Sequence, residues 1–328
     1  MKSRIVICGF GFMGQLHAAN ILRRDDAELV AVINPTAKEK IKPVSGNIAG
    51  AALDWSELDN IPFFAGWPQA FYGCDFDAVV IASPTLHHAK GAVECIRHNR
   101  HVFVEKPLCA TPAQIEELKT AIAGSSSIFH AGHVVRFMPE YVFLRELVSS
   151  GKYGKLRCLK LLRRTGVPSW GAWADKDTSI ASITGPVFDL NIHDIDFALS
   201  LLGKPVAISA ELEPCGNKLF NSTFRYDNGV TVEIDGGFAD ESGYPFRAGF
   251  TAVFDNAVLE YNSLAADKLV LSTGGRSESV VTSQDDAYRL EMEAFINEIH
   301  GGTSEHCSLD DAALAVEYSL EIIDKLKA

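Results

Sequence analysis

Residues 4–14 read RIVICGFGFMG and join a short apolar run to a spaced set of glycines. The β-branched run at its start is typical of a buried strand, and the residues that follow the glycines have helical character. Gly9, Gly11 and Gly14 fit the pattern GxGxxG, in which the glycines allow a tight turn, a close approach to a pyrophosphate and close helix packing. The stretch therefore predicts a dinucleotide-binding unit.

The residues that follow this stretch continue the same alternation of apolar runs and helical segments. Strands are expected at 28–33, 77–82, 101–104 and 127–131, with helices at 12–24 and 86–99. Strands that alternate with helices are typical of a doubly wound parallel sheet. We therefore predict an α/β fold whose first domain, residues 1–131, is a Rossmann domain.

The pattern changes after a helix expected at 139–149. Strands separated by turn residues are expected at 156–164, 206–212, 223–226, 230–238 and 248–254, with helices at 187–202, 286–300 and 309–327. This pattern predicts a second domain, residues 132–328, of the α+β class with a large, mostly antiparallel open sheet. Whether the last helix packs back on the first domain is left open.

Composition excludes several classes of function. The 328 residues include 47% apolar and 22% charged residues, which is typical of globular proteins, and the length predicts about two domains. A net charge of -12 argues against nucleic acid as a partner. The apolar runs are far shorter than the roughly 20 residues of a membrane span. The seven cysteines form no CxxC pair, so we expect reduced thiols in a cytoplasmic protein.

Asn34 bears on the choice of dinucleotide. It lies at the end of the second expected strand, where an acidic residue would bond to the adenine ribose and repel a 2'-phosphate. An amide still bonds to a hydroxyl but carries no charge, and Lys38 follows one turn later. The sequence therefore predicts NAD and leaves NADP open.

Three residues are candidates for the chemistry. Lys106 follows the strand at 101–104, where a lysine would bond to a substrate oxygen, although an ordinary surface lysine is the alternative. Asp189 and His193 lie four residues apart, which on a helix places both on one face. Imidazole titrates near neutral pH and suits proton transfer. A capping cluster on an exposed helix is the other interpretation of this pair.

A metal site built from Asp189, His193 and Asp196 is a further alternative. No dense ligand spacing such as HExxH supports it, so no metal is predicted.

Two further groups have a structural and a functional interpretation. The basic residues Arg157, Lys160, Arg163 and Arg164 are interpreted as a solvated strand edge, with contact to an anionic part of a substrate as the alternative. Trp170 and Trp173 lie in a loop before the helix at 187–202, where they would form an aromatic wall for a sugar ring or an apolar clamp on the sheet.

Taken together, these motifs resemble the glucose-fructose oxidoreductase and inositol dehydrogenase (Gfo/Idh/MocA) family. The resemblance rests on the glycine pattern followed by His17, on SPTLHH at 83–88, on EKP at 105–107, and on Asp189 with His193. It implies that Lys106, Asp189 and His193 form the catalytic set, with His193 as the acid/base. It also implies the following cofactor-binding residues: Gly9, Gly11, Phe12, Met13, Gly14, Asn34, Ser83, Pro84, His88 and Glu105.

The resemblance further implies an activity and an assembly. Similar proteins transfer hydride between a nicotinamide and a secondary alcohol or ketone of a sugar or polyol, and many form homodimers or homotetramers through the open sheet. Residues 132–139 and 189–196 look like those of members that act on nucleotide sugars, which would place Arg136 and Arg163 near a diphosphate. An NAD-assisted glycoside hydrolase and a non-catalytic redox sensor are the alternative functions.

Overall fold

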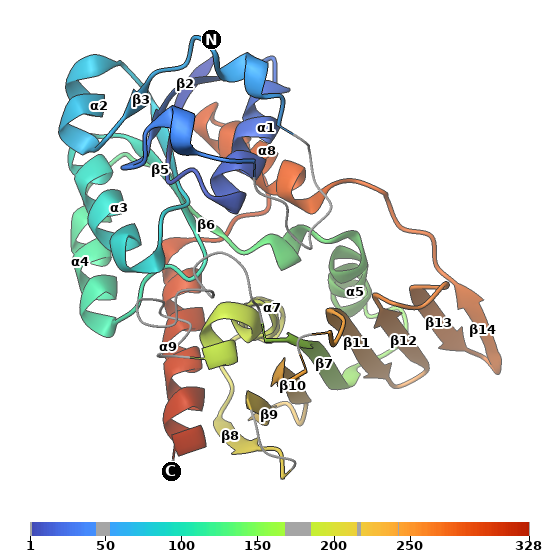
Figure 1. Cartoon of the computed structure of the whole chain (residues 1–328). Coiled ribbons are helices and arrows are strands. Elements are labelled where there is room, and N and C mark those ends of the chain that lie inside the picture. The colour runs from blue at the N-terminus through green and yellow to red at the C-terminus, as the bar shows by residue number, and fades with distance from the viewer. Residues whose placement is uncertain (1, 44–52, 168–184, 215–217, 242, 328) are drawn as a thin grey trace. The chain divides into compact units, whose positions relative to one another are not determined.

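The computed structural model describes residues 2–43, 53–167, 185–214, 218–241 and 243–327 (Figure 1). The chain divides into two compact units. The first contains residues 1–134 and 285–313, and the second contains residues 135–284 and 314–328. The segment 285–313 thus returns to the first unit after the whole second sheet has been formed.

The first unit is built on a six-stranded parallel sheet, which confirms the predicted Rossmann architecture. The strand order is β3-β2-β1-β4-β5-β6. The strands are β1 (Ser3–Cys8), β2 (Ala27–Ile33), β3 (Phe63–Phe64), β4 (Ala78–Ile81), β5 (His101–Glu105) and β6 (Phe129–Gly132). The order reverses at β1, which lies between β2 and β4. In open parallel sheets such a reversal marks the place where ligands bind.

Helices cover this sheet because its strands are apolar on both faces. The helices are α1 (Phe12–Leu22), α2 (Trp67–Gly73), α3 (His88–Arg97), α4 (Pro112–Ile122) and α8 (Ala287–Ile299), with short 3-10 turns η1 (Lys38–Lys40), η2 (Trp55–Leu58) and η3 (Thr85–His87). All four residues of β4 are buried. The core joins Ile5, Val80 and Phe103 of the strands to Met292 and Phe295 of α8. Helix α8 is therefore an integral part of the first unit.

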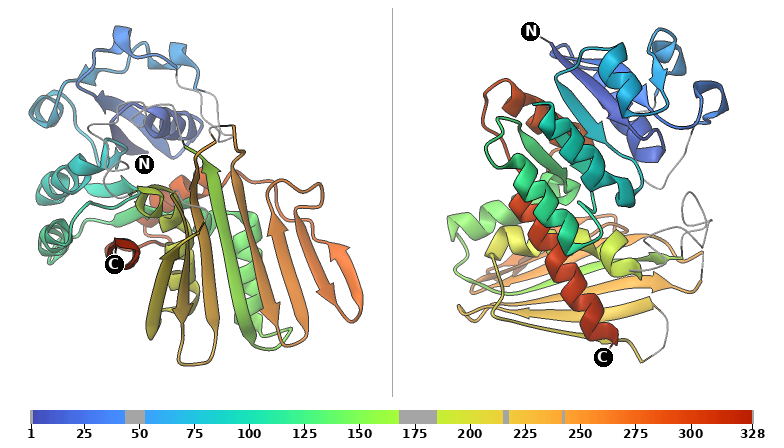
Figure 2. Two further views of the ribbon diagram at one scale, coloured as in Figure 1. Left: turned by 60° about the horizontal axis from the view of Figure 1, so that its bottom comes forward. Right: turned by 90° about the vertical axis from the view of Figure 1, so that its left-hand side faces the viewer.

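The second unit contains an eight-stranded sheet, and its mostly antiparallel pairing confirms the predicted fold class. The order is β14-β13-β12-β11-β7-β10-β9-β8, and the pairing of β7 with β10 is parallel (Figure 2, left). The strands are β7 (Leu156–Gly166), β8 (Ala207–Leu212), β9 (Lys218–Arg225), β10 (Thr231–Ala239), β11 (Arg247–Phe254), β12 (Ala257–Asn262), β13 (Leu269–Thr273) and β14 (Arg276–Ser279).

Helical segments accompany this second sheet. They are η4 (Val134–Phe137), α5 (Pro139–Ser150), η6 (Val187–Asn191) and α7 (Ile192–Leu202), and α9 (Leu309–Lys327) ends the chain. Tyr141 of α5 is fully buried, and its ring lies edge-on to Phe197 of α7 and to Phe250 of β11. These aromatic contacts fix α5 and α7 to the sheet.

Two general properties of the described part of the chain concern its helices and its cysteines. None of its helices has both the length and the apolar content needed to cross a bilayer. Its six cysteines are free thiols: Cys8, Cys74, Cys95, Cys109, Cys158 and Cys307.

Candidate functional site

The first part of the candidate site lies at the carboxyl ends of the central strands of the first unit. Cys8, the last residue of β1, pairs with Ile33 of β2 and with Ile81 of β4, and Ile81 pairs with Val104 of β5. The residues that follow these strand ends therefore line one edge of the sheet. The structure brings together at this edge the predicted cofactor-binding residues from the glycine turn, Asn34, the Ser83 segment and Glu105.

Gly9 and Gly14 each have a separate physical reason to lack a side chain, whereas Gly11 borders open space. Gly9 has φ of +92°, and an added Cβ would lie 2.5 Å from the amide nitrogen of Ser83. At Gly14 a Cβ would lie 2.0 Å from the carbonyl oxygen of Gly9, so helix α1 could not begin so close to β1. Above Gly11, which is exposed, a Cβ would meet nothing within 4 Å.

These surroundings fit a dinucleotide pyrophosphate. The space above Gly11 lies at the start of α1, where the helix amides favour an anion. Gly11 is the residue before the helix, no side chain caps it, and the first turn, which includes Phe12 and Met13, contains no acidic residue. An acidic side chain there would compete for the amides, so the turn is suited to accept a phosphate group.

Asn34 supports the glycine turn from β2. Its side-chain oxygen accepts a hydrogen bond from the amide of Phe10 at 3.1 Å, and its side-chain amide donates to the carbonyl of Thr36 at 3.0 Å. Lys38, the nearby base, donates to the carbonyl of Leu58 at 2.6 Å. Asn34 therefore holds the turn in addition to its predicted place beside the adenine ribose, which stays a prediction.

Lys106 follows β5, and the carboxylate of Glu105 holds its backbone amide. Glu105 is 5% exposed, and one of its carboxylate oxygens lies 2.7 Å from Nε2 of the buried His17. Its other oxygen accepts a hydrogen bond from the backbone amide of Lys106 at 3.1 Å. His17, whose position after the glycine pattern is part of the family resemblance, is thus a positioning residue for the strand end.

His88 holds the chain on the other side of Lys106. Its ring is 1% exposed, with Nδ1 at 2.8 Å from the carbonyl of Pro107 and Nε2 at 2.6 Å from the carbonyl of Ser83. Burial lowers the pKa of His88, while the two carbonyls partly oppose that shift. Both ring nitrogens face the protein backbone, so we assign His88 a positioning role. The Lys106–Pro107 peptide bond is cis.

Ser83 and Pro84 complete this edge of the first unit. Ser83 is half-buried and Pro84 is exposed, directly before η3. Their place beside Gly9 is where the sequence predicts the rest of the cofactor.

The second part of the candidate site lies on a helical segment of the second unit. Asp189 belongs to the π-helical turn η6 and His193 to the first turn of α7, and both are half-buried. The i, i+4 argument assumes a regular α-helix, but the segment is a regular α-helix only from Ile192 onward. Single π-helical turns are frequent at functional sites because they locally widen the helix. That the two side chains share one face stays a prediction.

Buried polar contacts fix the rotation of this helix on the sheet. Asp194 is fully buried, and its carboxylate accepts two hydrogen bonds from Arg163 of β7, at 2.8 and 3.0 Å. Asn191 is also fully buried, donates to the carbonyl of Arg163 at 3.2 Å, and fills the space where a Cβ on Gly236 would lie. These neighbours hold the segment that carries Asp189 and His193.

The buried arginines correct one sequence-based expectation. Arg163 is 2% exposed and bonded to Asp194, and Arg136 is 4% exposed and bonded to Asp196 at 2.7 and 2.8 Å. Two guanidinium groups already paired with carboxylates inside the protein are poorly placed to bind a substrate diphosphate. Asp194 and Asp196 therefore have a structural role as the partners of these two arginines.

The interpretation of the basic cluster as a strand edge is wrong for a topological reason. Strand β7 lies between β11 and β10, so it is central in its sheet. Arg164 is bonded to Glu213 and Asp235, Arg157 to Asp255, and Lys160 to Glu233. Trp170 and Trp173 lie outside the described residues.

Comparison with protein families matches both halves of the chain. Residues 3–133 match a model described as "Oxidoreductase family, NAD-binding Rossmann fold", and residues 141–260 match the "GFO/IDH/MocA C-terminal domain". Among curated proteins, inositol 2-dehydrogenase of Mycolicibacterium gilvum (strain PYR-GCK) is 29% identical over 313 residues, which cover 92% of this chain and 84% of the relative. D-glucoside 3-dehydrogenase of Escherichia coli (strain K12) is 29% identical over 210 residues, which cover 63% of this chain and 56% of the relative.

Solved structures show the same fold. Myo-inositol 2-dehydrogenase from Lactobacillus plantarum has a TM-score of 0.81 at 19% identity, and the match covers all of this chain (100%) and 98% of the other. UDP-N-acetylglucosamine 3-dehydrogenase from Acidithiobacillus ferrooxidans has a TM-score of 0.78 at 20% identity, with coverage of 100% and 98%.

Proposed function

The chain belongs to the GFO/IDH/MocA family of oxidoreductases, and we propose that it transfers hydride between NAD and a secondary alcohol or ketone of a sugar or polyol. One observation carries the proposal: the glycine turn leaves open space above Gly11 at the start of α1, next to the ends of β4 and β5. A dinucleotide seated there would extend toward the end of β5, where Lys106 follows.

Lys106 is the candidate for polarising the reacting oxygen. Its backbone is held by Glu105 on one side and, through Pro107, by His88 on the other. A positioned ammonium group would donate a hydrogen bond to the carbonyl or hydroxyl oxygen and favour negative charge as it develops there. A bound nicotinamide supplies the hydride chemistry.

His193 is the candidate acid/base, with Asp189 as its partner or as a second contact to the substrate. The imidazole would take the hydroxyl proton as the alcohol is oxidised and return it in the reverse direction. The buried contacts of Asp194 and Asn191 keep the helical segment from turning on the sheet. A fixed helix would hold the proton acceptor in one orientation, which supports catalysis by positioning.

Sugars and polyols are the favoured substrate class for two reasons. The relatives reported above are named for inositol, a glucoside and a nucleotide sugar, all of which present secondary hydroxyls. The expected contacts of Arg136 and Arg163 to a diphosphate are opposed by their buried ion pairs, which leaves the nucleotide sugars without identified arginine ligands. By the family resemblance, we also propose that the enzyme acts as a homodimer or homotetramer.

The proposal is tested with a panel of polyols, sugars and nucleotide sugars, each assayed in parallel with NAD and NADP. We expect a polyol or sugar to reduce NAD faster than NADP, since Lys38 is bonded to the chain itself and offers no established 2'-phosphate contact. Absorbance of the reduced nicotinamide is followed beside product release. Product without net reduced nicotinamide would instead indicate the NAD-assisted glycoside hydrolase.

Substitutions at the catalytic candidates sharpen this test. Lys106→Ala and His193→Ala should each lower kcat by about 10²- to 10⁴-fold, the usual contribution of a positioned acid or base, with little change in the Kd for dinucleotide. Lys152→Ala and His98→Ala, at exposed positions, are the matched controls. Full activity in either test variant removes that residue from the catalytic set, and absence of NAD and NADP binding to the unmodified chain refutes the proposal.

A further inference from the structure

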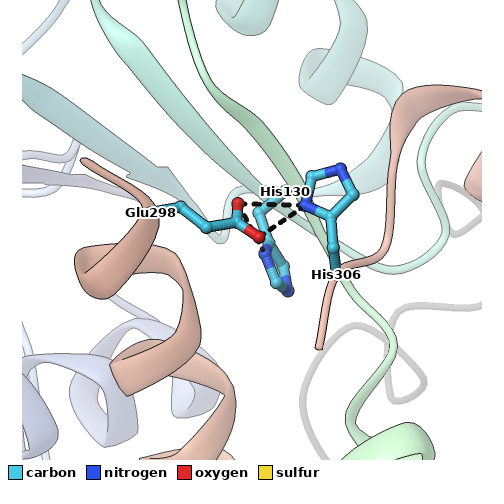
Figure 3. Close-up of side chains that lie close together, drawn as sticks. All are labelled: His130, Glu298 and His306. Atoms are coloured by element: carbon cyan, nitrogen blue, oxygen red, sulfur yellow. Dashed lines mark hydrogen bonds and ion pairs between the residues drawn. The ribbon is translucent and has the colours of Figure 1, made fainter. Parts of the chain in front are cut away.

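A second group of polar side chains lies in the first unit at strand β6, the edge of the sheet, with β4 and β5 between it and β1. It consists of His130 on β6, Glu298 near the end of α8, and His306 in the segment before α9. Both imidazole rings lie beside the carboxylate of Glu298 (Figure 3). Nδ1 of His306 is 2.9 Å from each oxygen of Glu298, and Nδ1 of His130 is 3.8 Å from Oε2.

We propose that His130, Glu298 and His306 bind a divalent transition-metal ion of the zinc type. The three side chains offer ligand atoms that lie within 4.8 Å of one another. In a tetrahedral zinc site with bonds near 2.1 Å, ligand atoms lie roughly 3.4 Å apart. The separations of the two imidazole nitrogens from the Glu298 carboxylate, 2.9 and 3.8 Å, lie on either side of that value.

The ligand types select among metals. Two imidazoles and one carboxylate are ligands that zinc, cobalt and nickel accept, whereas magnesium and calcium prefer oxygen atoms alone. Three protein ligands leave one tetrahedral position for a water molecule. We therefore expect zinc to bind here in preference to magnesium.

The surroundings hold two of the ligands in place. His130 is fully buried, with its ring stacked on Phe103 at a centroid distance of 5.7 Å and edge-on to Phe295 at 6.2 Å. The hydroxyl of Ser304 lies 3.4 Å from Oε1 of Glu298 and also donates to the carbonyl of Ala294 at 3.0 Å. Such outer contacts orient ligands and raise metal affinity.

The segment that carries His306 is fastened to the sheet and to α8. The amide of Ala131 on β6 donates to the carbonyl of Cys307 at 2.9 Å. Asn297 donates from its side chain to the carbonyl of Thr303 at 3.1 Å, and its own carbonyl accepts from Gly302 at 2.9 Å. His306 is therefore held by backbone contacts on both sides.

The cluster is also accessible from solvent. A cavity of about 750 Å³ is lined by Glu298 and His306, with Ser304 and Asp310 also on its wall. An ion and its water ligand thus have a path from solvent.

A bound ion would join β6, α8 and the segment before α9, which are far apart in the sequence. Metal ligands that come together only in the folded state add the binding free energy to the stability of the fold. The expected role is a clamp on the first unit, separate from the hydride chemistry.

The test uses the full-length, untagged chain after treatment with a chelator, and Zn²⁺ alone as the probe. Titration calorimetry should show one ion per chain, with Mg²⁺ giving no comparable signal. At a free Zn²⁺ concentration about 100-fold above Kd, Tm should rise by roughly 5 °C. His306→Gln and Glu298→Gln should each weaken Zn²⁺ binding at least tenfold. Removal of an outer contact alone already lowers the metal affinity of such sites by about this factor.

His98→Gln is the matched control. His98 lies beside Glu94, with Nδ1 at 3.9 Å from the carboxylate. Among the described residues, this pair belongs to no cluster of three possible metal ligands. Zn²⁺ binding should be unchanged in this variant. The His306 side chain is 40% exposed, so His306→Gln should fold like the unmodified chain. This variant alone tests the proposal if Glu298→Gln does not fold. No Zn²⁺ binding by the unmodified chain, or unweakened binding in His306→Gln, overturns the proposal.

Discussion

The two units hold their candidate catalytic side chains by different means. In the first, Lys106 follows a strand end at which the buried side chains of Glu105 and His88 bond to the backbone, beside a turn where Gly9 leaves no room for a side chain. In the second, the helical segment with His193 is fixed by a fully buried charge pair, Asp194 with Arg163. The first arrangement depends on side chains bonded to the backbone and on a turn without side chains, and the second on a pair of opposite charges removed from water.

The difference has an energetic consequence. Burial raises the pKa of Asp194, while Arg163 acts in the opposite direction by favouring the charged carboxylate. A buried pair of this kind contributes little net stability, but removal of one partner leaves the other charged and unpaired. Substitutions at such a pair should therefore cost more than substitutions in the glycine turn.

The largest expected effect follows from Asp194→Asn. With Arg163 left buried without its carboxylate, the free energy of unfolding should fall by about 3–5 kcal/mol. The matched control is Glu233→Gln, whose partner Lys160 lies on the same strand as Arg163 but in an exposed pair, with side chains 60% and 47% exposed. That variant should show no measurable loss, because water screens exposed pairs. Urea unfolding of the three proteins provides the measurement.

Equal losses in the two variants would contradict the comparison. They would mean that the buried pair is as well screened as the exposed one, and that the orientation of the His193 segment depends on other contacts.

The glycine turn should give the next largest effect. Gly14→Ala places a Cβ 2.0 Å from the carbonyl oxygen of Gly9, so helix and strand must separate, at a cost of about 1–3 kcal/mol. Gly11→Ala adds its Cβ to open space and should leave the free energy of unfolding within about 0.5 kcal/mol of the original. It should nevertheless weaken dinucleotide binding, since the added methyl group occupies the space proposed for the pyrophosphate.

Thermal unfolding and NAD titration separate the two glycine effects. Unchanged NAD affinity in Gly11→Ala would show that the pyrophosphate does not pass over Gly11. A fully stable Gly14→Ala would show that α1 can move away from β1 without loss.

Local signals explain which parts of the fold were predictable. The strand before Gly9 and the turn after it are determined by neighbouring residues, and so is the position of Lys106 at a strand end. Helix α4 is not among the predicted helices, although it has such a signal, a capping box formed by Thr111 and Gln114 with Pro112 between them. Strands β12 to β14 were missed because they have only six, five and four residues, and the patterns of such short strands are weak.

Contacts between distant residues explain the rest. Arg163 and Asp194 are 31 positions apart and Arg136 and Asp196 are 60 apart, so nothing in the local sequence distinguishes these arginines from substrate ligands. The proposed metal ligands come from β6, α8 and a loop, without the dense spacing by which metal motifs are detected. Long-range polar sites of this kind require the fold.

The smallest expected effect concerns a charge pair of the first unit. Arg4 on β1 and Asp77 before β4 form a pair in which the two side chains are 37% and 34% exposed. The hydrogen bonds from Arg4 hold the pKa of Asp77 below its ordinary value. The pair therefore contributes stability above the ordinary aspartate pKa, near 3.9, and loses it as the pH falls through the lower pKa of the folded state.

Asp77→Asn should accordingly cost far less than Asp194→Asn at pH 7, because water screens the exposed pair. The difference between the original chain and the variant should begin to shrink as the pH falls below about 4. It should approach zero only below the lowered pKa of Asp77 in the folded state, where both proteins carry a neutral side chain at this position. Urea unfolding at pH 7, 5 and 3 measures it. A difference that grows toward acid pH would mean that the carboxylate is unfavourable in the folded state, and the two units would then differ less in their use of charge than the structure indicates.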